Sequence, residues 1–197
     1  MTQNERIAAE YISNFEAQEG YPADSLLNVM LFETAGTLRP DIRNKQSGAV
    51  GLIQFTRKTL KGLGYTADQA ARMTVPEQLE ILVKPYFKPY KKRILASADW
   101  LDTYMAVLWP AGIGKPDSYV MFKAPSREYR QNSGLDVDKN GQVTKGDVRR
   151  KFTAQIAAVR KKKGFPSVAQ VIPAQSKQAG TSLIFALILL GTLFFRK

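Results

Sequence analysis

The stretch FETAGTLRPDIRNKQSGAVGLIQF, residues 32–55, decides the fold that this sequence predicts. It starts where an apolar run ends, and it places one carboxylate, Glu33, on the last turn of a predicted helix that stops near Gly36. The helix dipole disfavours negative charge at this end, and burial beside Phe32 would raise the carboxyl pKa in the same direction. A raised pKa is what a general acid needs near neutral pH. Glu33 is therefore the candidate acid.

Two motifs in this stretch resemble the soluble-lytic-transglycosylase branch of the lysozyme-like enzymes. In that family a Glu followed by a small hydroxyl residue, here Glu33-Thr34, supplies the catalytic acid. A Gly-x-x-Gly-Leu-Met-Gln segment, here GAVGLIQ at residues 48–54, shapes the sugar cleft. Thr replaces the usual Ser, and Ile replaces the usual Met. The resemblance covers residues 20–125 and implies that Thr34, Ser47, Gly51 and Gln54 bind substrate.

The resemblance implies cleavage of peptidoglycan at the β-1,4 bond between N-acetylmuramic acid and N-acetylglucosamine, with one carboxylate. The muramic acetamido group assists, its 6-hydroxyl replaces water, and the product carries a 1,6-anhydro ring. Glu33 would first donate a proton and then accept one. Without the motifs, Glu33 would be a solvated residue at a helix end, and Gln54 would only cap a helix beside packed core residues.

The third motif of that family, Ala-Tyr-Asn-x-Gly, is not intact. Its nearest match is LWPAG at residues 108–112, where Trp109 stands in place of the Tyr and Pro110 in place of the Asn. The aromatic rings of Tyr104 and Trp109 are candidates for stacking on a sugar. The alternative is that both are core aromatics. The lost amide leaves hydrolysis by water, and thus a hydrolytic muramidase, as an open alternative.

The composition limits the chemistry. The chain of 197 residues has no Cys and no His, which excludes disulfides, thiol nucleophiles and a Ser-His-Asp triad, and argues against zinc. We therefore expect catalysis without a cofactor. The net charge of +12 favours an anionic partner such as peptidoglycan or acidic lipid, unless it only keeps the protein soluble. No nucleic-acid module is recognisable, so we expect no nucleic-acid partner.

Residues 136–147, DVDKNGQVTKGD, resemble a twelve-residue calcium loop with Gly141 at its turn position. Asp closes the loop where EF-hands have Glu, as in dockerin-type loops. A structural calcium ion is expected here, and an Asx-rich turn without metal is the alternative. The expected ligands are Asp136, Asp138, Asn140, Gln142 and Asp147.

The C-terminal stretch AGTSLIFALILLGTLFF, residues 179–195, is apolar and bracketed by Lys177 and Arg196-Lys197. This pattern predicts a transmembrane helix near the lower length limit for crossing a bilayer, with a buried helix of a soluble domain as the alternative. The N-terminus does not resemble a secretory signal peptide. The loop charges favour a cytoplasmic enzyme domain, which conflicts with a substrate in the cell wall.

The fold class expected is mainly α: a lysozyme-like transglycosylase domain followed by a C-terminal transmembrane helix. Helices are expected at 4–18, from 22 to near 36, and at 56–63, 76–86, 99–108 and 146–160, with no multi-stranded sheet. Pro85 and Pro89 are expected to break the stretch 84–92. The predicted divisions are 1–130 (enzyme domain), 131–163 (calcium-loop motif and helix), 164–178 (linker) and 179–195 (membrane helix).

The function expected from these features is that of a membrane-anchored peptidoglycan lytic transglycosylase. The conflict between charge pattern and substrate favours delivery in a bacteriophage virion membrane, with virion proteins as further partners. The host inner membrane is the alternative location. The rival functions are a non-catalytic glycan-binding virion membrane protein and a basic nucleic-acid-binding membrane protein.

Overall fold

The computed structural model describes residues 1–166. The described chain is mainly helical, as the sequence predicts. The predicted transmembrane helix at 179–195, and the predicted linker beyond Pro166, lie outside the described residues. Among the helices of residues 1–166, none combines the length and the apolar character that a bilayer crossing requires.

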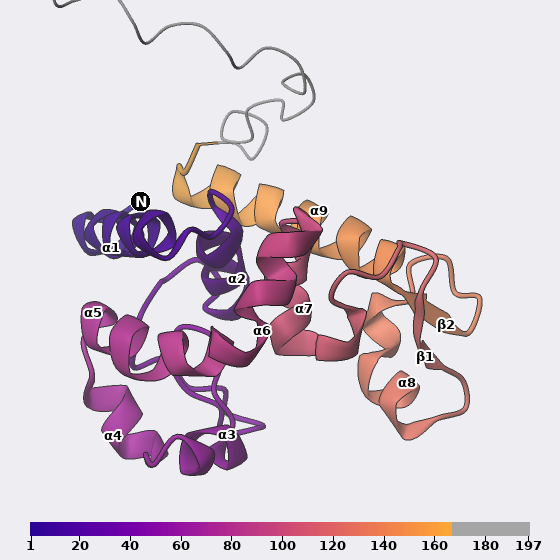
Figure 1. Cartoon of the computed structure of the whole chain (residues 1–197), viewed down its shortest axis with the longest axis horizontal. Coiled ribbons are helices and arrows are strands. Elements are labelled where there is room, and N and C mark those ends of the chain that lie inside the picture. The colour runs from indigo at the N-terminus through magenta and orange to yellow at the C-terminus, as the bar shows by residue number, and fades with distance from the viewer. Residues whose placement is uncertain (167–197) are drawn as a thin grey trace, which may run out of the picture.

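The elements follow one another as helices, with a small sheet near the end (Figure 1). In chain order they are α1 (Gln3–Glu19), α2 (Ser25–Glu33), α3 (Arg57–Gly62), α4 (Ala67–Arg72), α5 (Val75–Gln78), the π-helical turn η1 (Leu79–Val83), α6 (Lys84–Ser97), α7 (Leu101–Leu108), the 3-10 turn η2 (Pro110–Gly112), β1 (Val120–Lys123), α8 (Arg127–Asn132), the 3-10 turn η3 (Ser133–Leu135), β2 (Gln142–Thr144) and α9 (Lys145–Lys163).

The long helix α9, the last one within residues 1–166, contacts α2, η3 and β2. In Figure 1 it runs along one side, past α2 and α7, while α3 and α4 gather at one end and β1, β2 and α8 at the other. The strands β1 and β2 are antiparallel, with Phe122 opposite Val143. This two-stranded sheet was not expected from the sequence, because its strands are too short to show an alternating pattern.

One hydrophobic cluster forms the core, and α2 lies within it. Val29, Met30 and Leu31 of α2 are fully buried, together with Phe152 and Ile156 of α9. Fully burying a side chain of this size contributes about 1.5–3 kcal/mol. The segment after residue 130 therefore shares its core with the segment before it.

Buried polar side chains tie α9 to the earlier helices. The guanidinium of Arg160, with 2% of its surface exposed, donates to Asp24 Oδ2 at 2.7 Å and to Asn28 Oδ1 at 2.9 and 2.7 Å. At the other end of α9, Lys145 Nζ lies 2.5 Å from Asp102 Oδ1 and 3.0 Å from Asp99 Oδ2. Each buried cation has its counter-charge, which is the condition for keeping it in the interior.

The prolines of the basic stretch do not interrupt the helix, so the break expected at Pro85 and Pro89 is wrong. Pro85 lies in the first turn of α6, directly after the π-helical turn η1, and Pro89 lies inside α6. The π-helical turn η1 runs directly into α6 and continues the helical path from α5. This continuity orients Tyr86 and Phe87 toward the core.

Candidate active site

The helix that carries Glu33 is fixed at its start by a carboxylate from α1. Asp24 precedes α2 in a left-handed conformation and its side chain does not cap the helix. Instead Glu16 Oε1 accepts from the N–H groups of Leu26 and Leu27 at 2.5 and 3.1 Å, and its Oε2 accepts from Asp24 N at 3.2 Å. Burial raises the pKa of Glu16 to about 8, against the opposing effect of these donors. α1 thereby sets the position of α2.

The end of the same helix is fixed by Thr34. Its hydroxyl donates to Met30 O at 2.6 Å and accepts from Leu38 N at 3.0 Å, and none of its surface is exposed. Thr34 therefore shapes the turn that follows Glu33. The Thr34 hydroxyl is therefore engaged by the backbone, and the substrate-binding role expected for Thr34 stays a prediction.

Glu33 lies at the last position of α2 and is partly buried. Burial raises the pKa of its carboxyl group to about 7, and it is the only cause of the shift. No cation within residues 1–166 pairs with it to oppose this shift. Glu33 therefore holds its proton near neutral pH, as a general acid must.

Burial and the charge of Glu33 together raise the pKa of two tyrosines, Tyr86 and Tyr104. Burial raises the pKa of Tyr86 to about 12, with smaller contributions from the charges of Tyr90 and Glu33. The pKa of Tyr104 is raised as well, by burial and then by Glu33. The charge of Glu33 therefore acts on both hydroxyls, and both tyrosines belong to the buried or partly buried core residues of this region.

Tyr86 is a site residue that the sequence reasoning missed. Its ring meets Phe55 edge to face at 5.9 Å, and its hydroxyl donates to Ala106 O on α7 at 3.0 Å. It therefore connects the end of the glycine-rich turn with α7 beside Glu33. The spacing of aromatic residues in 84–92 could have marked Tyr86 as a core-facing residue. The helix break expected at the two prolines argued against that reading.

Tyr104 is a packed core residue in this structure. Its ring stacks on Phe152 of α9 at 4.3 Å and meets Phe32 edge to face at 5.2 Å, and 5% of its surface is exposed. Both neighbours cover ring surface that a sugar would need. Trp109 is partly exposed and meets Phe122 at 5.1 Å, while its Nε1 is buried without a hydrogen-bond partner in the described chain.

The glycine-rich turn is a tight loop at residues 48–55. Val50 and Phe55 exchange backbone hydrogen bonds of 3.1 and 2.8 Å, and Gly51 N donates to Ile42 O at 3.0 Å. Gly51 has φ of 90° and Gln54 has φ of 51°. Glycine adopts such a conformation without strain, whereas Gln54 does so at a cost.

The side chain of Gln54 folds back on this turn. Its Nε2 donates to Gly51 O at 3.0 Å and to Ile42 O at 3.4 Å, so its donors are used internally and the amide oxygen remains for a ligand. Ser47 lies exposed at the tip of the preceding loop, where its hydroxyl accepts from Ala49 N at 3.2 Å. The expected site residues thus divide into a buried framework (Thr34, Gly51, Tyr104) and more accessible groups (Glu33, Ser47, Gln54, Trp109).

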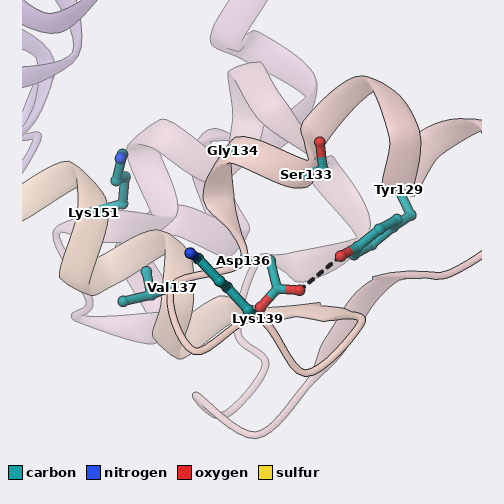
Figure 2. A pocket seen from close by; sticks show the side chains of 7 residues that line it. All are labelled: Tyr129, Ser133, Gly134, Asp136, Val137, Lys139 and Lys151. Carbon is teal, nitrogen blue, oxygen red and sulfur yellow. Dashed lines mark hydrogen bonds between the residues drawn. The ribbon is translucent and has the colours of Figure 1, made fainter.

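The calcium-like loop joins η3 to β2 and the start of α9. Asp136 Oδ2 accepts from Tyr129 Oη at 2.7 Å (Figure 2). It also accepts from Gly141 N at 2.9 Å. Asp138 Oδ1 accepts from Asn140 N at 3.4 Å, and Asn140 Oδ1 accepts from Gln142 N at 2.8 Å. The loop is folded by its own Asx hydrogen bonds, as the metal-free alternative requires.

Asp147, the expected closing ligand, faces other partners. Its Oδ2 caps α9 by accepting from Thr144 N at 2.9 Å and Thr144 Oγ1 at 2.5 Å, and its Oδ1 pairs with Arg150 at 2.5 Å. Within residues 1–166 no three acidic side chains come close enough together to hold a metal ion. Lys139 and Lys151 also line the adjoining pocket of about 370 Å³. The arrangement described here therefore does not fit a bound calcium ion unless Arg150 moves.

A scan against protein-family models and searches of curated proteins and solved structures found no match to this chain.

Proposed function

We propose that this chain cleaves the glycan strands of peptidoglycan by lytic transglycosylation, with Glu33 as its only catalytic carboxyl group. The observation that carries the proposal is the pKa of about 7 that burial gives to Glu33. A partly buried carboxyl group without a paired cation destabilises the fold when it is ionised. Such groups cluster at sites of proton transfer. The resemblance of residues 33–34 and 48–54 to the transglycosylase motifs supplies the reaction class.

In the proposed reaction, Glu33 donates its proton to the bridging oxygen as the bond from C1 of the muramic residue to that oxygen breaks. The acetamido group of the same sugar stabilises the positive charge that develops at C1. The resulting Glu33 carboxylate then takes the proton from the 6-hydroxyl while O6 bonds to C1. The products are a new 4-hydroxyl end and a 1,6-anhydro end, and the acid is regenerated without water.

Pro110 motivates one alternative outcome. It stands where the related motif has an Asn, so this chain lacks the amide expected to hold the acetamido group. Water could then reach C1 and give a reducing end. This is the hydrolytic muramidase alternative.

The test is the incubation of the full-length chain, in detergent buffer, with purified peptidoglycan, followed by mass spectrometry of the products. Anhydro ends support the transglycosylase proposal, and reducing ends support the muramidase. Intact strands that still bind the protein favour a non-catalytic glycan-binding protein. Glu33→Gln should abolish cleavage, while Glu128→Gln, which removes an exposed carboxyl group on α8, should not. Cleavage by Glu33→Gln would refute the acid assignment.

We further propose that the apolar sequence at residues 179–195 anchors the enzyme in a membrane, and that this membrane belongs to a phage virion. The apolar length and the flanking cations support the anchor. Flotation with liposomes tests it: the full-length chain should float, and a chain with Leu187 and Leu189 both replaced by Arg should not. Detection of the chain in purified virions, rather than in host membranes, tests the location.

A further inference from the structure

Gln78, at the end of α5, is a fully buried amide that joins three separate segments of the chain. Its Nε2 donates to Pro40 O at 2.7 Å and to Ala70 O at 2.8 Å, and its Oε1 accepts from Leu52 N at 3.0 Å. None of its surface is exposed. The pattern of two carbonyls and one N–H admits a single orientation of the amide, because a flip would set its oxygen against both carbonyls.

The glycine-rich turn is built directly against this amide. A Cβ atom at Gly51 would lie 2.7 Å from Gln78 Oε1 and 3.1 Å from Nε2, and Gly51 also has φ of 90°. Only glycine allows both the close approach and this backbone conformation. The requirement for glycine at position 51 thus follows from its contact with Gln78.

Two of the three segments that Gln78 joins are continuous with candidate site residues. One follows Glu33: Thr34 holds Leu38 N at 3.0 Å, and Pro40 comes two residues later. The other is the turn that begins at Gly51 and contains Gln54. A shift of either segment alone would break a hydrogen bond to a side chain that has no water to replace it.

We propose that Gln78 is a positioning residue for glycan cleavage, whose buried amide fixes the spacing between the segment that follows Glu33 and the turn that carries Gln54. This inference rests on the proposed function. Gln78 touches no substrate and transfers no proton; it acts through Pro40 and Leu52. A misplacement of about 1 Å in an enzyme site can cost about 100-fold in rate. Loss of the Gln78 hydrogen bonds should therefore lower the cleavage rate even where the variant remains folded.

Two variants separate its hydrogen bonds. Gln78→Met keeps the volume and removes all three bonds. Gln78→Glu keeps the acceptor for Leu52 N but presents a carboxylate to Pro40 O and Ala70 O, and its protonation at low pH restores one donor. Val143→Ala, at a buried position on β2, is the matched control for a loss of stability without a change at the contacts of Gln78.

The experiment measures saturating rates on soluble glycan strands, from pH 5 to 8, at a temperature where circular dichroism shows each variant folded. We expect Gln78→Met to lower the rate about 10- to 100-fold at every pH. We expect the rate of Gln78→Glu to be lowered by the same factor at pH 8. Toward pH 5 this rate should recover part of the loss relative to wild type. Val143→Ala should keep the wild-type rate and profile while its Tm falls.

Two results would overturn the inference. One is a folded Gln78→Met with a lowered Tm but a wild-type rate, which would leave Gln78 a stabilising residue only. The other is a Gln78→Glu whose rate relative to wild type does not depend on pH. If the wild-type chain cleaves nothing, the proposed function fails instead. Hydrogen exchange at Leu52 N then still tests the hydrogen bond to Gln78. The exchange rate should rise in Gln78→Met, remain slow in Gln78→Glu at low pH, and stay unchanged in Val143→Ala.

Discussion

Gly36 and Val159 approach so closely that a Cβ atom on Gly36 would lie 2.7 Å from Val159 Cγ1. Gly36 belongs to the turn that follows Glu33, and Val159 belongs to α9. The contact explains why α9 cannot be separated from the candidate site, although it lies far from Glu33 along the chain. Gly36 also has φ of 79°, a conformation in which a side chain is strained.

Gly36→Ala should therefore be strongly destabilising. Gly20→Ala provides the control, since Gly20 has φ of 73° but no atom within 4 Å of its Cβ position. We expect about 1 kcal/mol of destabilisation for Gly20→Ala from backbone strain alone, and at least twice that for Gly36→Ala. Urea unfolding measures both. Val159→Ala combined with Gly36→Ala should recover part of the loss, and strictly additive effects would contradict the contact.

Glu33→Gln should stabilise the protein at high pH. The folded-state pKa of about 7 lies above the unfolded value of 4.5, so the folded state binds more protons in between and stability falls as pH rises through that interval. The free energy of unfolding falls by about 1.4 kcal/mol per pH unit, and by roughly 3 kcal/mol in total once the pH is above 7. The free-energy difference between Glu33→Gln and wild type should grow by this amount from pH 4.5 to 7.5. A difference that is flat with pH, like that expected for Glu128→Gln, would show that Glu33 is not desolvated.

The pH dependence of cleavage should report the same group. A protonated Glu33 is required, so the rate at low substrate concentration should be level below pH 7 and fall about tenfold per unit above it. Initial rates on soluble glycan strands provide the measurement. A falling limb near pH 4 to 5, where an ordinary Glu titrates, would contradict the burial of the acid.

Lys145 should be essential to stability because it neutralises the fully buried Asp102. Lys145→Met leaves that carboxylate without its cation, which typically costs about 3–5 kcal/mol. The double variant with Asp102→Asn should recover much of the loss. Lys151→Met, on the same helix and without a carboxylate partner in the described part of the chain, should change stability little. Thermal unfolding of the wild type, Lys145→Met, Asp102→Asn and the double variant decides between a coupled pair and two independent residues.

Calcium binding at the 136–147 loop would require Arg150 to release Asp147. We expect calcium, if it binds, to raise the Tm of Arg150→Gln more than that of wild type, because the substitution frees the Asp147 oxygen that Arg150 contacts at 2.5 Å. Asp136→Asn should remove the effect. Equal behaviour with magnesium, or no Tm shift in any variant, would eliminate the calcium prediction.

The sequence predicted the helices well where apolar spacing was long and regular, as in α1, α7 and α9. It also predicted the raised pKa of Glu33, since a helix end beside Phe32 can be inferred locally. It did not predict Thr34 as a buried turn residue, or Tyr104 as a residue packed on Phe152. Both depend on which segments meet in three dimensions.

Gln78 shows why the rest could not be predicted. Its partners Pro40 and Leu52 lie 38 and 26 residues away, and no local pattern marks a Gln that will bind two distant segments. The prolines of α6 were misleading for a different reason. A proline is read as a helix breaker from sequence, but the π-helical turn before Pro85 changes the local backbone hydrogen-bond pattern, and the helix continues.

The bonds from Arg160 to Asn28 connect residues 132 positions apart, on helices at opposite ends of the described chain. During synthesis, α2 leaves the ribosome long before α9 exists to cover it. The core that α2 and α9 share can therefore form only when nearly all of the described chain has emerged, so a nascent or prematurely terminated product would leave the side of α2 that carries Asn28 in contact with water.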